Sequence, residues 1–108
     1  MYTYNITFVT SPVEELQLTE YLQNRVIPRL FSKDSLAINP ELRKVVEIGG
    51  ETPDPQHGVS IALAATFPTA EVAHLWHENF LLPALAECDQ KFGQQVLHFT
   101  TLLENISV

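Results

Sequence analysis

The sequence predicts an α+β fold of the ferredoxin-like type, with the element order βαββαβ, an antiparallel sheet and two helices on one face. Two observations predict it. Apolar and polar residues alternate over Tyr2–Val9 and again over Val59–Phe67, which is typical of strands. Each of these segments is followed by a long helical pattern and a second strand, so the same unit occurs twice, about 55 residues apart. Right-handed crossovers would place the first and third strands in the centre of the sheet.

The first long helix is predicted between Ser11 and about Phe31. Ser11 is expected to cap it, with Pro12 at the first helical position and Glu14 completing a capping box. Pro28 should bend this helix, because proline lacks the backbone N–H and clashes with the preceding turn. Apolar side chains recur every four residues and predict one buried row: Leu18, Leu22, Val26 and Leu30.

The second long helix is predicted to begin within Pro68–Glu71 and to end at about Phe92, with Gly93 as its C-cap. Its apolar side chains form two rows, one of Val72, Trp76 and Phe80 and one of Leu81, Leu85, Cys88 and Phe92. The change of row falls just before Pro83, where we expect a kink.

The two remaining strands are predicted at Leu42–Ile48 and from Gln95 to about Ile106. A loop over Ser32–Glu41 should precede the first of them. A polar hairpin loop containing Glu51–Pro55 should follow it.

Length and composition limit the classes of protein that the chain can represent. The 108 residues are expected to form one domain, residues 1–108. A net charge of −7 with six Lys and Arg disfavours binding to nucleic acids or to anionic membranes. The single cysteine excludes an intrachain disulfide and suits the cytoplasm. No apolar run approaches the roughly 18 residues of a membrane span, and we expect no signal peptide.

One face of the predicted sheet should remain uncovered, because both helices lie on the other. Its side chains are small, largely uncharged and half apolar: Asn5, Thr7, Ser60, Ala62, Ala64 and Thr66, with one side of the last strand. A solvated face would normally carry Lys and Glu. We therefore expect the same face of a second subunit to cover it, which would give a homodimeric α+β barrel around a cavity.

Five residues are candidates for a pocket in that cavity, for a small apolar ligand: Asn5, Thr7, Ser60, Trp76 and His98. Trp76 lies in an apolar row, so a core position is the stronger interpretation. His98 could face the cavity as an acid or base, or it could be a hydrogen-bonded residue of an edge strand, which is favoured.

Other residues suggest less chemistry. Glu71, His74 and Glu78 share a helix face at a spacing that a metal site could use, but no second cluster completes the ligand set. A solvated polar face is favoured, and we predict neither a metal nor a cofactor. Cys88 has apolar neighbours along the helix and is predicted to be a buried hydrophobe.

Three segments resemble a family of short bacterial proteins known as a domain of unknown function: Tyr4–Phe8, Val26–Pro28 and the closing Phe99–Glu104. The resemblance spans nearly the whole chain and is most specific in the closing motif. It implies a ferredoxin-like fold of the dimeric α+β barrel type, and it implies no established activity.

Haem-degrading monooxygenases of the wider superfamily resemble the chain at two positions. They use an Asn on the first strand with a Trp and a His on the second helix, and Asn5 and Trp76 occupy similar places. The helix has no His near Ala86, where the similarity would require one, and His77 points elsewhere. The sequence therefore favours a non-catalytic homodimer that binds a small ligand or a partner. A cofactor-independent or haem-type monooxygenase-like enzyme is the alternative.

Overall fold

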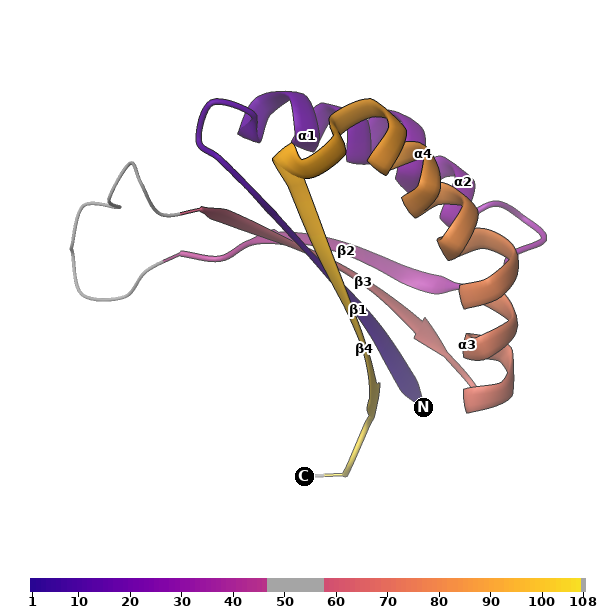
Figure 1. The fold of residues 1–108 in the computed structure, drawn as a ribbon. Helices are drawn as coiled ribbons and strands as arrows, with labels where there is room; N and C mark the ends of the chain where they lie inside the picture. Colours follow the sequence, from indigo (N-terminus) through magenta and orange to yellow (C-terminus); the bar gives the residue numbers. More distant parts are fainter. Residues whose placement is uncertain (47–57, 108) are drawn as a thin grey trace.

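The computed structural model describes residues 1–46 and 58–107 and has the predicted α+β fold (Figure 1). Its antiparallel sheet has the strand order β2-β3-β1-β4. The central strands are β1 (Tyr2–Thr10) and β3 (Val59–Phe67), and the edge strands are β2 (Ile38–Lys44) and β4 (Val96–Glu104). Both long helices cover the same face of the sheet. The predicted order of central and edge strands is confirmed.

Each long helix consists of an α segment, a π-helical turn and a second α segment. The first contains α1 (Glu15–Tyr21), η1 (Leu22–Val26) and α2 (Ile27–Leu30). The second contains α3 (Ala70–Trp76), η2 (His77–Leu81) and α4 (Leu82–Phe92), and a 3₁₀ turn, η3 (Gly93–Gln95), follows it. The left-handed backbone of Gly93, with φ of 59°, ends the helix as predicted.

The π turns explain how two prolines fit into long helices. The N–H of Ile27 donates to the carbonyl of Leu22, and that of Leu82 donates to the carbonyl of His77, each across five residues. Pro28 and Pro83 follow directly and lie in the first turn of the next α segment, where no N–H is needed. Where the sequence predicted a bend at each proline, the structure has a π turn directly before it.

The internal repeat is preserved, but the strands align differently from the prediction. Residues 11–14 separate β1 from α1, whereas only residues 68–69 separate β3 from α3. The first residues of the two strands make Tyr2 the counterpart of Val59, which is 57 positions away rather than the predicted 55. The π turns keep the predicted spacing.

The predicted capping box at Ser11 is wrong. The helix begins at Glu15, and Glu14 at its N-terminus makes no side-chain capping bond. The N–H of Glu14 instead donates to the carbonyl of Ser11 in a tight turn, at 3.1 Å. Thr69 does cap the second helix, because its Oγ1 accepts from the N–H of Val72 at 3.1 Å.

Strand β2 begins at Ile38, four residues before the predicted Leu42. Its pairing with β3 shifts between Ile38 and Glu41, and Asn39 there has a φ of 55°, a conformation that Asn tolerates. Pro40 fits because β2 is an edge strand. The last predicted residues of this strand, 47–48, and the predicted hairpin loop lie outside the described residues.

The core lies between the helices and the sheet. The predicted apolar row of the first helix is buried along its whole length. In the second helix, the row that begins at Leu81 and ends at Phe92 is buried as well. Strands β1 and β3 contribute alternate residues to this core: Tyr4, Ile6, Phe8, Ile61, Leu63, Ala65 and Phe67. The intervening residues of these strands point to the other face of the sheet, which no helix of residues 1–46 and 58–107 covers.

Candidate functional site: the open face of the sheet

The open face is formed by the alternate residues of all four strands that point away from the helices. Strand register places Asn5 between Ala64 and Thr101, and Thr7 between Ala62 and Phe99. The two central strands contribute small side chains apart from Asn5 and Val9: Thr3, Asn5, Thr7, Val9, Ser60, Ala62, Ala64 and Thr66. The middle of the face therefore carries short side chains and forms a floor.

Larger apolar side chains stand along strand β4 on the same face. Leu97 lies beside Val9, Phe99 beside Thr7 and Leu103 beside Thr3. They are 55%, 59% and 48% exposed. On the opposite edge, Ile38 lies beside Thr66 and is also exposed. Large apolar groups thus border a floor of small residues, and most of their surface faces outward.

Charge on this face is confined to strand β2. Glu41 lies opposite Ala64, and Arg43 lies opposite Ala62. Arg43 Nη2 and Glu41 Oε2 form an ion pair 2.5 Å apart. The pair neutralises itself locally, so the centre of the face and the β4 side carry no formal charge.

One polar pair lies near the centre of the floor. The Nδ2 of Asn5 donates a hydrogen bond to the Oγ1 of Thr7 at 3.1 Å, and both residues are half-buried. Ser60 lies nearer one end of the same floor, opposite Val9. These three predicted pocket residues are therefore on one surface of the chain.

Trp76 lies elsewhere, in the core between the helices and the sheet. It is 1% exposed, and its indole N–H donates to the carbonyl of Leu30 at 2.9 Å. The rings of Tyr4 and Phe67 pack against it, with centroids 5.8 and 4.9 Å away. Its hydrogen-bonding capacity is thus used within the core.

His98 is also separate from the open face. It lies opposite Phe8, whose side chain points toward the helices. Its Nε2 is 2.8 Å from Asp89 Oδ1 at the C-terminal end of α4, and the edge of its ring approaches the ring of Phe8. Of the two alternatives for this histidine, the structure has the hydrogen-bonded edge-strand residue.

Sequence reasoning assigned one side of the last strand to this face without naming its residues. The strand does alternate, with Leu97, Phe99 and Leu103 on one side. The sequence alone did not show which of its two sides belongs to the open face. Trp76 and His98 were grouped with the face because residue type suggested chemistry. Burial and register separate them from it.

The other residues with potential chemistry form no site in the described parts of the chain. Within residues 1–46 and 58–107, no group of three or more His, Cys, Asp and Glu side chains is placed to hold a metal ion. Cys88 is buried, and burial, with a smaller contribution from Asp89, raises the pKa of its thiol to about 11. No helix in these residues is long and apolar enough to cross a membrane.

Three solved structures resemble this chain along nearly its whole length. An ethyl tert-butyl ether d (EthD) family protein from Bacillus halodurans has 15% identity and a TM-score of 0.68, covering 98% of this chain and 100% of its own. Two dimeric ferredoxin-like proteins from an uncultured marine organism have 10% and 16% identity, with TM-scores of 0.58 and 0.59. They cover 99% and 100% of this chain and 97% of their own. At such identities the likeness shows the shared ferredoxin-like fold.

Sequence comparison identifies a family for the chain, but it assigns no activity. No curated protein sequence matches the chain. The sequence model of a domain of unknown function, DUF4286, matches residues 1–106.

Proposed function

The chain belongs to the DUF4286 family, and we propose that it is a non-catalytic homodimer whose two open sheet faces meet and enclose a small apolar ligand. The observation that carries this proposal is the distribution of side-chain size on the open face. Large apolar groups stand along its β4 edge, and small groups occupy its central strands.

The β4 side supplies an apolar contact surface. Leu97, Phe99 and Leu103 are about half exposed, and they occupy one edge of a face that lacks charge outside β2. Contiguous apolar patches on a soluble protein are typical of association sites. A second copy is the occupant that fits, because a two-fold contact buries the same patch on both subunits. The two marine relatives in fold are themselves described as dimeric, which supports this choice.

The low floor supplies the space for a ligand. If the larger side chains bring the two faces together at their edges, the small residues of β1 and β3 remain separated across the two-fold axis. Such a space would be lined by methyl groups and by a few polar atoms, of which the Asn5–Thr7 pair is the most central. An apolar pocket with few convergent polar groups is typical of small-molecule sites.

The enzyme alternative has less support. Trp76 and His98 were its candidate chemical groups, and both make their contacts on the helix side of the sheet. On the open face, the described polar side chains include the hydroxyls and amide of the floor, the Thr101 hydroxyl and the Glu41–Arg43 pair. A cytoplasmic location, which we also propose, suits the single buried thiol of Cys88.

The oligomeric state tests the first half of the proposal. Light scattering of the wild-type protein should give about twice 12.2 kDa. Phe99→Glu should yield a monomer, because it places two charges in a desolvated contact. Leu75→Glu is the matched control, since Leu75 is 61% exposed on helix α3. A dimeric Phe99→Glu protein, or a monomeric wild type, would contradict the proposed contact.

Native mass spectrometry tests the second half. The purified dimer should retain a small molecule, and the variant Ala62→Phe should dimerise without it, because the added ring fills the floor. Retention of the same molecule by Ala62→Phe would place the ligand elsewhere. A wild-type dimer that carries nothing and takes up no apolar probe would refute the ligand while leaving the dimer intact.

A further inference from the structure

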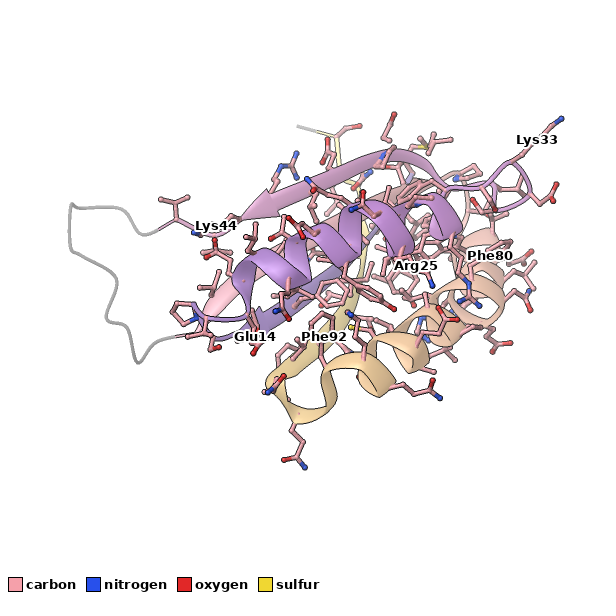
Figure 2. The ribbon with its side chains drawn as sticks, turned by 90° about the horizontal axis from the view of Figure 1, so that it is seen from above. Glu14, Arg25, Lys33, Lys44, Phe80 and Phe92 are labelled. Carbon is pink, nitrogen blue, oxygen red and sulfur yellow. The ribbon has the colours of Figure 1, made fainter. Side chains whose placement is uncertain are left out.

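We propose a second binding site, for the carboxylate or phosphate group of a small anion, in a depression between the two helices on the side of the molecule away from the open sheet face. The depression has a volume of about 250 Å³. Its lining comes from both helices: Gln17, Glu20, Tyr21, Asn24, Arg25 and Lys91. Figure 2 shows Arg25 and Phe92 directed toward the groove between the two helices.

The helices run in opposite directions, so each turn of one helix faces a turn of the other. We call each such pair of facing turns a rung of a ladder. In Figure 2, Glu14 before α1 and Phe92 at the end of α4 lie at the same end of the helical layer. On one rung, Arg29 Nη1 forms an ion pair with Glu87 Oε2 at 2.8 Å. One turn along both helices, the corresponding residues are Arg25 and Lys91, which carry the same charge. The ladder therefore changes from an attractive pair to a repulsive one at the depression.

Neither cation forms an ion pair among residues 1–46 and 58–107, although the carboxylate of Glu20 lines the same depression. Ion pairs there engage Arg29, Arg43 and Lys44, and of the chain's other three Lys and Arg residues, two line this one depression. That placement is unusual for a chain with a net charge of −7. A bound anion would relieve the repulsion between Arg25 and Lys91.

The remaining lining groups suit an anion. The side-chain amides of Gln17 and Asn24 and the Tyr21 hydroxyl can donate hydrogen bonds. Lys91 is held in position, because its Nζ lies 5.8 Å from the ring centroid of Tyr21 and 5.6 Å from that of Phe92. Guanidinium and ammonium groups together match the oxygens of a carboxylate or phosphate. Glu20 opposes binding with one negative charge, which gives the test a variant of opposite sign.

The π turn contributes to this geometry. Asn24 and Arg25 belong to η1, whose wider turn carries one more residue than an α turn. Both residues lie between the buried Leu22 and Val26 and line the groove. Such turns occur frequently at functional sites.

The test is a titration of amide resonances with inorganic phosphate and, separately, citrate, in chloride buffers of equal ionic strength. The wild-type protein should show saturable shifts at residues 17–25 and 91 with at least one of the two anions. Arg25→Gln should weaken binding about tenfold, since it removes a charge-assisted hydrogen bond. Glu20→Gln should strengthen it. Lys33→Gln is the control, because Lys33 is exposed in the loop after α2 and far from Phe92 (Figure 2).

Lys91→Glu adds an independent readout. It places a carboxylate beside Arg25, so phosphate and citrate binding should be lost, and the new like-charge pair with Glu87 four residues earlier should lower the melting temperature slightly. Shifts that do not saturate, or equal weakening by Arg25→Gln and Lys33→Gln, would overturn the proposed site. Because the depression lies on the helical side, these outcomes do not depend on whether the subunit dimerises through its open face.

Discussion

Trp76 shows how a single side chain can join the two helices. Its indole N–H donates to the carbonyl of Leu30, which belongs to the last turn of α2 and has no partner farther along that helix. One hydrogen bond therefore satisfies the buried indole and a helix-terminal carbonyl at once. The residue chosen from the sequence as a candidate for chemistry has this structural role.

Two substitutions separate the packing of Trp76 from its hydrogen bond. Trp76→Ala should reduce the free energy of unfolding by about 3–5 kcal/mol, as a large-to-small core change. Trp76→Phe should cost about 1–3 kcal/mol, chiefly from the Leu30 carbonyl left without a donor. Urea unfolding followed by circular dichroism measures both. A loss below about 1 kcal/mol for Trp76→Ala would contradict the core position.

Cys88 should be unreactive in the folded protein. Burial raises its pKa to about 11 from the model-compound value of 9.0, so the thiol is protonated at neutral pH. A thiol-specific disulfide reagent should react slowly with the native protein and rapidly in urea. Since the folded state holds this proton more tightly, its contribution to stability is complete below about pH 9 and is lost as pH rises toward 11. Rapid native labelling at pH 7 would show that the site opens.

The two π turns determine which side chains of the long helices face the core. In the first helix, buried residues recur at intervals of four from Leu18 to Leu30, longer than the 3.6-residue period of an α-helix. In the second, Trp76 and Leu81 are both buried although they are five positions apart. A wider turn brings such positions back to the same face. The spacing of apolar residues in the sequence therefore already indicated a π turn, although only a kink at each proline was predicted.

A deletion tests this account of the second helix. Removing Asn79, which is exposed within η2, together with Pro83→Ala, should convert the π turn to an α turn and keep Trp76 and Leu81 on one face. Removing the exposed Glu87 from α4 should instead rotate Cys88 and Phe92 out of the core by about 100°. We expect the first protein to unfold cooperatively and the second to be severely destabilised. Equal destabilisation by the two deletions would contradict the role of η2.

Element order, strand order and the buried helix faces could be predicted from the sequence, because alternation and periodicity report directly on burial. The start of β2 could not, since the irregular pairing around Asn39 and Pro40 depends on a position at the edge of the sheet. The helix start at Glu15 was missed because the same residues, Ser11 to Glu14, also form a simple turn. For the candidate site, the open-face residues of β1 and β3 were predictable from alternation. The apolar row already favoured the core for Trp76, whereas its bond to the Leu30 carbonyl and the Asp89 partner of His98 depend on tertiary contacts that no local pattern encodes.

At the scale of the whole molecule, two surfaces face in opposite directions. One is the open sheet face, apolar along β4, and the other is the helical layer with its charged groove. We propose a separate occupant for each, a second subunit and a small anion. A sandwich of one sheet and one helical layer makes this separation possible, because side chains on the two surfaces do not meet.

Haem should not bind specifically to this molecule. The described histidines are engaged or remote from the open face: His98 contacts Asp89, His77 stacks on Tyr4 and His74 lies exposed on α3. Hemin titration should therefore give no saturable Soret shift at one site per subunit. A saturable shift that His98→Ala or His77→Ala abolishes would favour the oxygenase alternative over the binding protein.

The two edges of the sheet have unequal consequences for solubility. The β2 edge is interrupted by Asn39 and Pro40, which cannot template a regular ladder. The β4 edge is a nine-residue strand without proline, and it carries Leu97, Phe99 and Leu103. A free subunit therefore presents a segment suited to cross-β stacking with copies of itself. The proposed dimer would cover these apolar side chains, so variants that separate its subunits without adding charge to β4 should convert to fibrils on storage.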